Sequence, residues 1–271
     1  MDNKPKISVI MGVYTSKNKD MVRYAIDSII NQTFNEWEFV ICDDGSPDDT
    51  WEFLNNEYGT DSRFVLVKNE SNGGLRVALN TCLKNSKADY VVRMDADDYS
   101  RPDRLEKLYD YVIKNPDVDV VGTAMMSFDE CGEHGIHHPR KLNPQKMDFL
   151  HGSVVAHAST IMKKSSLLAV DGYRVAWETT RCEDTDLYMR MCANGAKFHN
   201  IDDAMYYVRQ DADSFARRKY INRVKEFVVK WKGFKTLKMP IWAYIYTFKP
   251  LIVGLIPAGL LAKIKKIIKR K

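Results

Sequence analysis

Three carboxylates follow an apolar run in the first half of the chain. Residues 91–94, Val-Val-Arg-Met, lead directly to Asp95, Asp97 and Asp98. Carboxylates this close repel each other, so at neutral pH they favour a bound cation. Oxygen ligands suit Mg²⁺ or Mn²⁺, which proteins usually hold through one or two carboxylates together with substrate phosphates. The alternative is an exposed acidic turn before a helix that begins near residues 100–103.

Acidic pairs occur at two further positions. Asp43 and Asp44 follow an apolar segment at residues 37–42, and Glu183 and Asp184 begin a helical pattern. Each pair has an ordinary structural explanation, either a β-turn with helix entry or an interaction with a helix dipole. Open α/β sheets, however, bind ligands beyond the carboxyl ends of their strands. Because all three acidic sites fit such an edge, we favour one shared functional site.

The surrounding segments predict a sheet that would bring these acids together. Short apolar runs alternate with helical patterns, and we expect strands at residues 7–14, 37–42, 63–67, 89–94 and 118–121. This alternation predicts an α/β fold with a mostly parallel central sheet flanked by helices. After Gly122 we expect a loop at 129–145, a strand at 154–162, a short helix at 164–170, a helix from Glu183, and strands at 197–201 and 205–209.

Taken in order, these segments resemble the motif set of the family-2 glycosyltransferases. The resemblance covers residues 7–210 and rests on the first strand and on Asp43-Asp44-Gly45-Ser46, Asn72-Gly73-Gly74, Asp95-Ala96-Asp97-Asp98, Gly172-Tyr173-Arg174 and Glu183-Asp184. It implies an inverting enzyme of the GT-A fold. Two positions depart from the family pattern, since Gly12 replaces the usual proline of the first motif and Thr15 replaces the asparagine after it.

The resemblance implies a site for a nucleotide-sugar donor, with a UDP-sugar favoured. Val13 and Tyr14 would border the nucleotide base, and Asp43 or Asp44 would form a hydrogen bond with it. The rest of the donor would lie near Gly73, Arg76, Asp95, Ala96 and Asp97.

The resemblance also implies the catalytic groups. Asp97, with Asp95, would hold Mn²⁺ or Mg²⁺, and Asp184 would be the catalytic base with Glu183 beside it. A divalent metal can stabilise the charge that builds on a leaving diphosphate, and a carboxylate can take the proton of the attacking hydroxyl. Because that attack inverts the anomeric centre, the base has to lie on a segment separate from the metal site, as Asp184 does.

The charge is distributed unevenly along the chain. Residues 214–271 contain 16 Lys or Arg and one acid, Glu226, and carry +15, which leaves −10 on residues 1–213. Residues 239–262 are long and apolar enough for a membrane span, but three prolines and Lys249 interrupt them. The final segment has the pattern of an interfacial helix, because six cations lie opposite Leu260, Leu261, Ile264, Ile267 and Ile268. We expect peripheral attachment to an anionic membrane, and the alternative is that residues 239–262 pack on the catalytic domain.

These features define the expected organisation. Residues 1–213 would form the catalytic domain, with a nucleotide-binding half at 1–122 and an acceptor half at 123–213, followed by a basic, apolar helical tail at 214–271. Five cysteines without a CxxC pair and no signal-peptide pattern favour a cytoplasmic protein, peripheral on the inner face of the cell membrane. The expected activity is transfer of a sugar to a glycan acceptor, with a lipid-linked glycan favoured.

Two other functions remain open. A metal-dependent nucleotidyltransferase would use similar acids but would need no base at Asp184. A catalytically inactive module of the same fold could dock at membranes, although the intact acidic residues argue against it. Nucleic acid is a disfavoured partner, because the basic residues of the tail are interleaved with apolar runs. Three histidines in the predicted loop lack the spacing of a zinc site: His134, His137 and His138.

Overall fold

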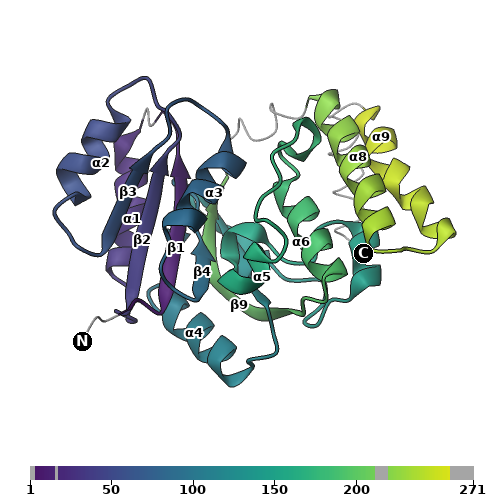
Figure 1. Ribbon diagram of the computed structural model, residues 1–271, viewed down its shortest axis with the longest axis horizontal. Coiled ribbons are helices and arrows are strands. Elements are labelled where there is room, and N and C mark those ends of the chain that lie inside the picture. The colour runs from purple at the N-terminus through teal and green to yellow at the C-terminus, as the bar shows by residue number, and fades with distance from the viewer. Residues whose placement is uncertain (1–3, 16–17, 211–218, 257–271) are drawn as a thin grey trace.

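The computed structural model describes residues 4–15, 18–210 and 219–256 (Figure 1). Within this part of the chain, nine strands form one continuous sheet. One half of the sheet is parallel and the other is mixed.

The first half is parallel, as the sequence predicts. From its outer edge inwards, its strands are β3 (Phe64–Lys68), β2 (Trp37–Asp43), β1 (Ile7–Val13) and β4 (Tyr90–Arg93). Four helices alternate with these strands or follow them: α1 (Lys19–Ile30), α2 (Thr50–Tyr58), α3 (Leu75–Asn85) and α4 (Arg104–Lys114).

Each face of this half has its own hydrophobic core, because alternate residues of a strand point to opposite sides. Val9 and Met11 of β1 belong to a core with α1 and α4, whereas Ile10 belongs to a core with α3. Helices therefore cover both faces of the sheet (Figure 1), and the carboxyl ends of β1, β2 and β4 remain together at one edge.

The second half is mixed. The short strand β8 (Ile161–Lys163) is antiparallel to both β4 and β6 (Val120–Asp129). β6 is parallel to β9 (Phe198–Arg209), which pairs antiparallel with β5 (Tyr99–Ser100). The complete order is β3-β2-β1-β4-β8-β6-β9-β5, with β7 (Gly132–His137) paired to β6.

Three local predictions are wrong in this half. The expected loop at 129–145 contains the strand β7. This segment has two glycines and exposed side chains, so its sequence shows no strand pattern. It is a strand because it pairs with the long neighbouring strand β6. The expected strand at 154–162 is largely replaced by η2 (His157–Ser159), and pairing begins only at β8. The two expected strands at 197–201 and 205–209 are one strand, which stays in contact with β6 through shifts in register.

The remaining elements of this half are short, apart from the helix that begins at the predicted base. They are η1 (Lys146–His151), α5 (Lys164–Leu168), η3 (Trp177–Thr179) and α6 (Glu183–Ala193). α6 begins at the predicted residue, Glu183.

The predicted tail begins with a helix that packs against the acceptor half. The described elements are α8 (Tyr220–Thr236), η4 (Ile241–Phe248) and α9 (Lys249–Gly254). A Cβ at Gly233 would lie 2.3 Å from the sulfur of Met189 on α6, so glycine permits the close approach of the two helices. Phe234 and Ala243 are buried in the same core as α6. In Figure 1 these helices lie beside α6, at the opposite end of the molecule from α1 and α2.

The outer side of η4 and α9 is apolar and exposed. Ile241 is 90 %, Ile245 72 % and Leu255 73 % accessible, and Trp242 and Ile252 are also exposed. Within the described ranges, no helix combines the length and the apolar character needed to cross a bilayer. The predicted interfacial helix with Leu260 to Ile268 lies outside the described residues.

Candidate active site

The first predicted site residues meet at the carboxyl edge of the parallel strands. Val13 at the end of β1 lies in register with Asp43 at the end of β2. The amide of Met94, just after β4, donates to the carbonyl of Ile10, which places Asp95 beyond the same edge. Tyr14 is half exposed beside them. The sheet therefore brings together residues that are 80 positions apart in the sequence.

Asp43 and Asp44 have different environments, although both are buried. Asp44 accepts hydrogen bonds from the Asn69 side chain at 2.7 Å and from the amides of Gly73 at 3.2 Å and Gly74 at 2.6 Å. Asp43 accepts one bond through Oδ1 from the Ser46 amide, whereas its Oδ2 accepts no hydrogen bond from the described residues and lies 3.8 Å from the Lys68 ammonium group. Asp44 thus holds the glycine loop, and Asp43 keeps an oxygen that can accept a hydrogen bond from a ligand.

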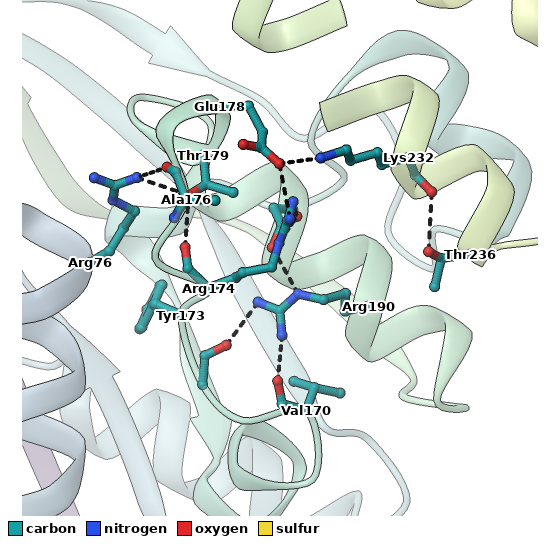
Figure 2. A network of polar contacts seen from close by, with 12 residues as sticks. Arg76, Val170, Tyr173, Arg174, Ala176, Glu178, Thr179, Arg190, Lys232 and Thr236 are labelled. Carbon is teal, nitrogen blue, oxygen red and sulfur yellow. Dashed lines mark hydrogen bonds and ion pairs between the residues drawn. The ribbon is translucent and has the colours of Figure 1, made fainter. Parts of the chain in front are cut away.

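The glycine loop has a conformation that needs glycine. Gly74 has φ +81, and a Cβ at Gly73 would lie 2.6 Å from that of Val77. Arg76 follows at the start of α3, but its Nη1 donates to the Ala176 carbonyl and, at 2.9 Å, to the Thr179 hydroxyl (Figure 2). Arg76 therefore joins residues 1–122 to residues 123–213, and its contact with the donor stays a prediction.

The three acids after β4 form a compact cluster. Carboxylate oxygens of Asp95, Asp97 and Asp98 all lie within 4.8 Å of one another. Asp98 is buried, and its Oδ2 accepts a 2.7 Å bond from the Tyr206 hydroxyl on β9. Burial first, and then the charges of Asp95 and Asp97, raise the pKa of Asp98 to about 8. Each of these carboxylates makes ionisation of the others less favourable. A hard divalent cation, which prefers oxygen ligands, would therefore fit this cluster.

The structure adds one functional residue that the sequence analysis missed. Arg93, at the end of β4, is buried and forms an ion pair with Asp95. Its positive charge also lowers the pKa values of Glu183 and Asp184, so it acts on the acid cluster and on the predicted base. The sequence feature that could have identified Arg93 is its position as a single charged residue within the apolar segment at 91–94.

Glu183 and Asp184 lie at the amino end of α6 and are partly buried. Burial raises the pKa of Asp184, and hydrogen bonds from Thr185 and from the Ser153 side chain oppose that rise. Burial and the neighbouring charge of Asp184 raise the pKa of Glu183. A carboxylate with a raised pKa near a substrate site is suited to accepting a proton.

An ion-pair network fixes the start of α6. Arg174, from the predicted Gly-Tyr-Arg motif, contacts Asp186 on α6 at 2.5 Å and Glu178 at 3.0 Å. Arg190 contacts Asp186 at 2.8 Å, and Lys232 of α8 contacts Glu178 at 2.6 Å. Figure 2 shows these side chains converging from three segments. The motif thus positions the helix that carries Asp184, and it does so partly through α8.

Comparison with known proteins decides the family. A sequence profile described as "Glycosyl transferase family 2" matches residues 8–169. The chain belongs to glycosyl transferase family 2. A Bacillus subtilis (strain 168) protein described as "Putative glycosyltransferase EpsE" is 35% identical over 98% of this chain and 95% of its own length. An Escherichia coli relative, UDP-Gal:alpha-D-GlcNAc-diphosphoundecaprenol beta-1,3-galactosyltransferase, is 29% identical over 80% of this chain and 78% of its own.

Solved structures confirm the GT-A fold. TarS of S. aureus in complex with UDP-GlcNAc aligns with a TM-score of 0.68 and 17% identity, over 93% of this chain and 82% of that chain. The mannosyltransferase PcManGT of Pyrobaculum calidifontis, in complex with GDP-Man and Mn2+, aligns with a TM-score of 0.63 and 17% identity, over 99% and 81%. The family and fold expected from the sequence motifs are confirmed, and this chain is a glycosyltransferase.

Proposed function

We propose that this glycosyltransferase moves a sugar, with inversion, from a UDP-sugar to a lipid-linked glycan acceptor. Three groups support the proposal: the Asp43 oxygen without a hydrogen-bond partner, the acid cluster after β4, and the buried carboxyl group of Asp184. Arg93 acts electrostatically on the last two, which supports a single reaction centre.

The donor would lie across the ends of β1, β2 and β4. Asp43 Oδ2 would accept the N–H of uracil, with Val13 and Tyr14 beside the base. TarS, which binds UDP-GlcNAc, and PcManGT, which binds GDP-Man, have the same fold. The buried acceptor at Asp43 supports a base that presents an N–H donor, as uracil does.

Asp97 and Asp95 would hold Mn²⁺ or Mg²⁺, and the buried Asp98 would support this pair. The metal would stabilise negative charge on the departing diphosphate as a Lewis acid. The cluster of oxygen ligands supports a hard cation.

Asp184 would perform the proton transfer. An acceptor hydroxyl would give its proton to the Asp184 carboxylate as its oxygen forms a bond to the anomeric carbon. The bond from that carbon to the diphosphate oxygen would break, and UDP would leave on the opposite face. The raised pKa of Asp184 makes it a better proton acceptor than an exposed aspartate.

The enzyme would attach peripherally to the inner face of the cell membrane. The exposed apolar side of η4 and α9 supports this attachment, as do the 16 basic residues of 214–271. Apolar burial and attraction to anionic lipids act together in interfacial segments.

A thermal-shift panel of nucleotide sugars, each with and without Mn²⁺, tests the donor assignment. A ligand at 100 times its Kd stabilises the folded state by about 2.7 kcal/mol. We expect UDP-sugars with Mn²⁺ to give the largest shifts, and Asp43→Ala to reduce them. No shift with any nucleotide sugar would overturn the proposal. Formation of a nucleotide sugar from a nucleoside triphosphate and a sugar phosphate would instead identify a nucleotidyltransferase.

A further inference from the structure

A cavity of about 470 Å³ lies on the acceptor side of the molecule, outside the donor site described above. It is enclosed by the end of β7, the segment at 138–144, η1 and residues 153–156. Its lining is rich in cationic and titratable side chains, among them His137, His138, Arg140, Lys141 and His151. The three-histidine group noted in the sequence therefore contributes two members to this cavity.

One side of the cavity adjoins the proposed base. Ser153 lines the cavity, and its hydroxyl donates to the Val155 carbonyl at 2.9 Å. Its side chain lies near enough to Asp184 to lower the pKa of that carboxyl group. Val155 and Ala156 continue the wall beside it. A sugar that occupies this side would have its hydroxyl groups close to the carboxylate that has to take a proton.

Another side of the cavity adjoins the apolar surface. His151 at the end of η1 lines the cavity, and its ring lies 5.9 Å from that of Tyr246 on η4. Tyr246 in turn lies 6.4 Å from Trp242, which is exposed together with Ile241 and Ile245. Neighbouring aromatic rings thus link the cavity wall at His151 to the exposed side of η4.

The charges between these two sides favour an anion. Lys141 is paired with Asp148 at 2.8 Å, and His138 with Asp202 at 2.6 Å. Arg140 is different, because its Nη1 donates to the His151 carbonyl at 2.8 Å and it forms no ion pair with a described residue. An arginine without a counter-ion, beside a histidine, is suited to bind a phosphate.

We infer that this cavity binds the head group of a lipid-linked acceptor. The terminal sugar lies at Ser153 and Asp184, the phosphate or diphosphate at Arg140, and the hydrocarbon chain over Tyr246 and Trp242. This inference rests on the proposed function, and it adds where the acceptor binds and that its recognised group is an anion between sugar and lipid.

Two acceptors with the same sugar test the inference. One carries the sugar on a lipid diphosphate and the other on a neutral alkyl glycoside of equal chain length. We expect Arg140→Ala to raise KM for the diphosphate acceptor at least tenfold, with KM for the neutral acceptor and for the donor unchanged. Arg140→Lys should recover part of the loss. Lys84→Ala, which removes an exposed charge from α3, is the matched control.

A binding measurement without turnover separates this inference from the proposed function. Farnesyl diphosphate and inorganic pyrophosphate are titrated into the wild type and into Arg140→Ala. If the wild type binds farnesyl diphosphate more tightly than Arg140→Ala does, the result supports acceptor binding in the cavity, even if no sugar transfer is found. Equal effects of Arg140→Ala on both acceptors, or equal binding of the probe by both proteins, would overturn the inference while leaving the proposed transfer intact. Binding of pyrophosphate as tight as that of farnesyl diphosphate would contradict the lipid path over Trp242.

Discussion

At the scale of single residues, neighbouring acids have different environments. Asp44 accepts hydrogen bonds from the glycine loop, whereas Asp43 has one carboxylate oxygen without a hydrogen bond from the described residues. Asp98 is buried under Tyr206, whereas Asp97 is exposed. Exposure to solvent therefore distinguishes Asp97, the proposed metal ligand, from the buried Asp98.

The first residue prediction concerns the metal. Asp97→Asn should weaken Mn²⁺-dependent binding of a UDP-sugar and nearly abolish turnover, because it removes one anionic ligand. Its Tm should stay close to that of the wild type, since the side chain is exposed. Asp110→Asn, an exposed acid on α4, should have no effect on binding. Donor binding that is unchanged by both EDTA and Asp97→Asn would rule out the metal role.

The second concerns the base. Asp184→Asn should keep donor binding but lose transfer by about 10²–10⁴-fold, the usual loss when general-base help is removed. Glu183→Gln is the matched comparison and should retain more activity. Transfer at the wild-type rate by Asp184→Asn would move the role to Glu183 or Asp186.

The third concerns pH. Only ionised Asp184 can accept a proton, so activity should fall on the acid side at a pH above the pKa of an ordinary aspartate, because burial raises its pKa. Arg93 lowers that pKa, so Arg93→Met should move the acid limb of the kcat profile to higher pH. Arg93→Lys, which keeps the charge, should move it less. A limb that does not shift in Arg93→Met would show that Arg93 does not act on the base.

At the scale of elements, α6 is positioned by partners on both sides. The Arg174 network fixes its amino end, and α8 packs along it at Gly233. Because α8 lies beyond the motif residues, part of the predicted tail packs on the helix that carries Asp184.

Gly233→Leu tests that packing. The new side chain would overlap Met189, and overpacking of a core typically costs about 1–3 kcal/mol. We expect a lower free energy of unfolding in urea, and partial recovery in the double variant Gly233→Leu/Met189→Ala. Lys235→Leu, exposed on the same helix, is the control. A Gly233→Leu protein as stable as the control would mean that α8 does not pack closely on α6.

At the scale of the whole molecule, η4 packs on residues 123–213 and presents an apolar side to its surroundings. Met239 and Ala243 are buried, whereas Ile241 and Ile245 between and after them are exposed. The segment therefore packs on the protein with one side and presents the other to its surroundings.

Liposome flotation tests membrane attachment. We expect the wild type to float with anionic vesicles, with partial release by high salt, because salt screens the basic residues but not apolar burial. Ile241→Ser/Ile245→Ser should float less, since full burial of each side chain contributes about 1.5–3 kcal/mol. Ile113→Ser, which changes an exposed isoleucine on α4, should float like the wild type. Equal flotation of all three proteins would contradict attachment through η4.

The sequence by itself determined the parallel half of the sheet and the segments that carry the acids. Period-2 and period-3.6 patterns are local, so β1, β2, β4 and the start of α6 follow from nearby residues. The order of the motifs predicted the family, because six motifs in the right order occur by chance far less often than any single motif.

Tertiary structure decided the features that depend on distant partners. β7 exists because β6 offers it a pairing edge, and no local pattern of Gly132–His137 predicts it. The division of roles between Asp43 and Asp44 depends on which of them the glycine loop reaches, 25 to 30 residues away. Arg93 belongs to no motif, and only the fold brings its charge near Asp184, because electrostatic coupling depends on distance in space and not on distance along the chain.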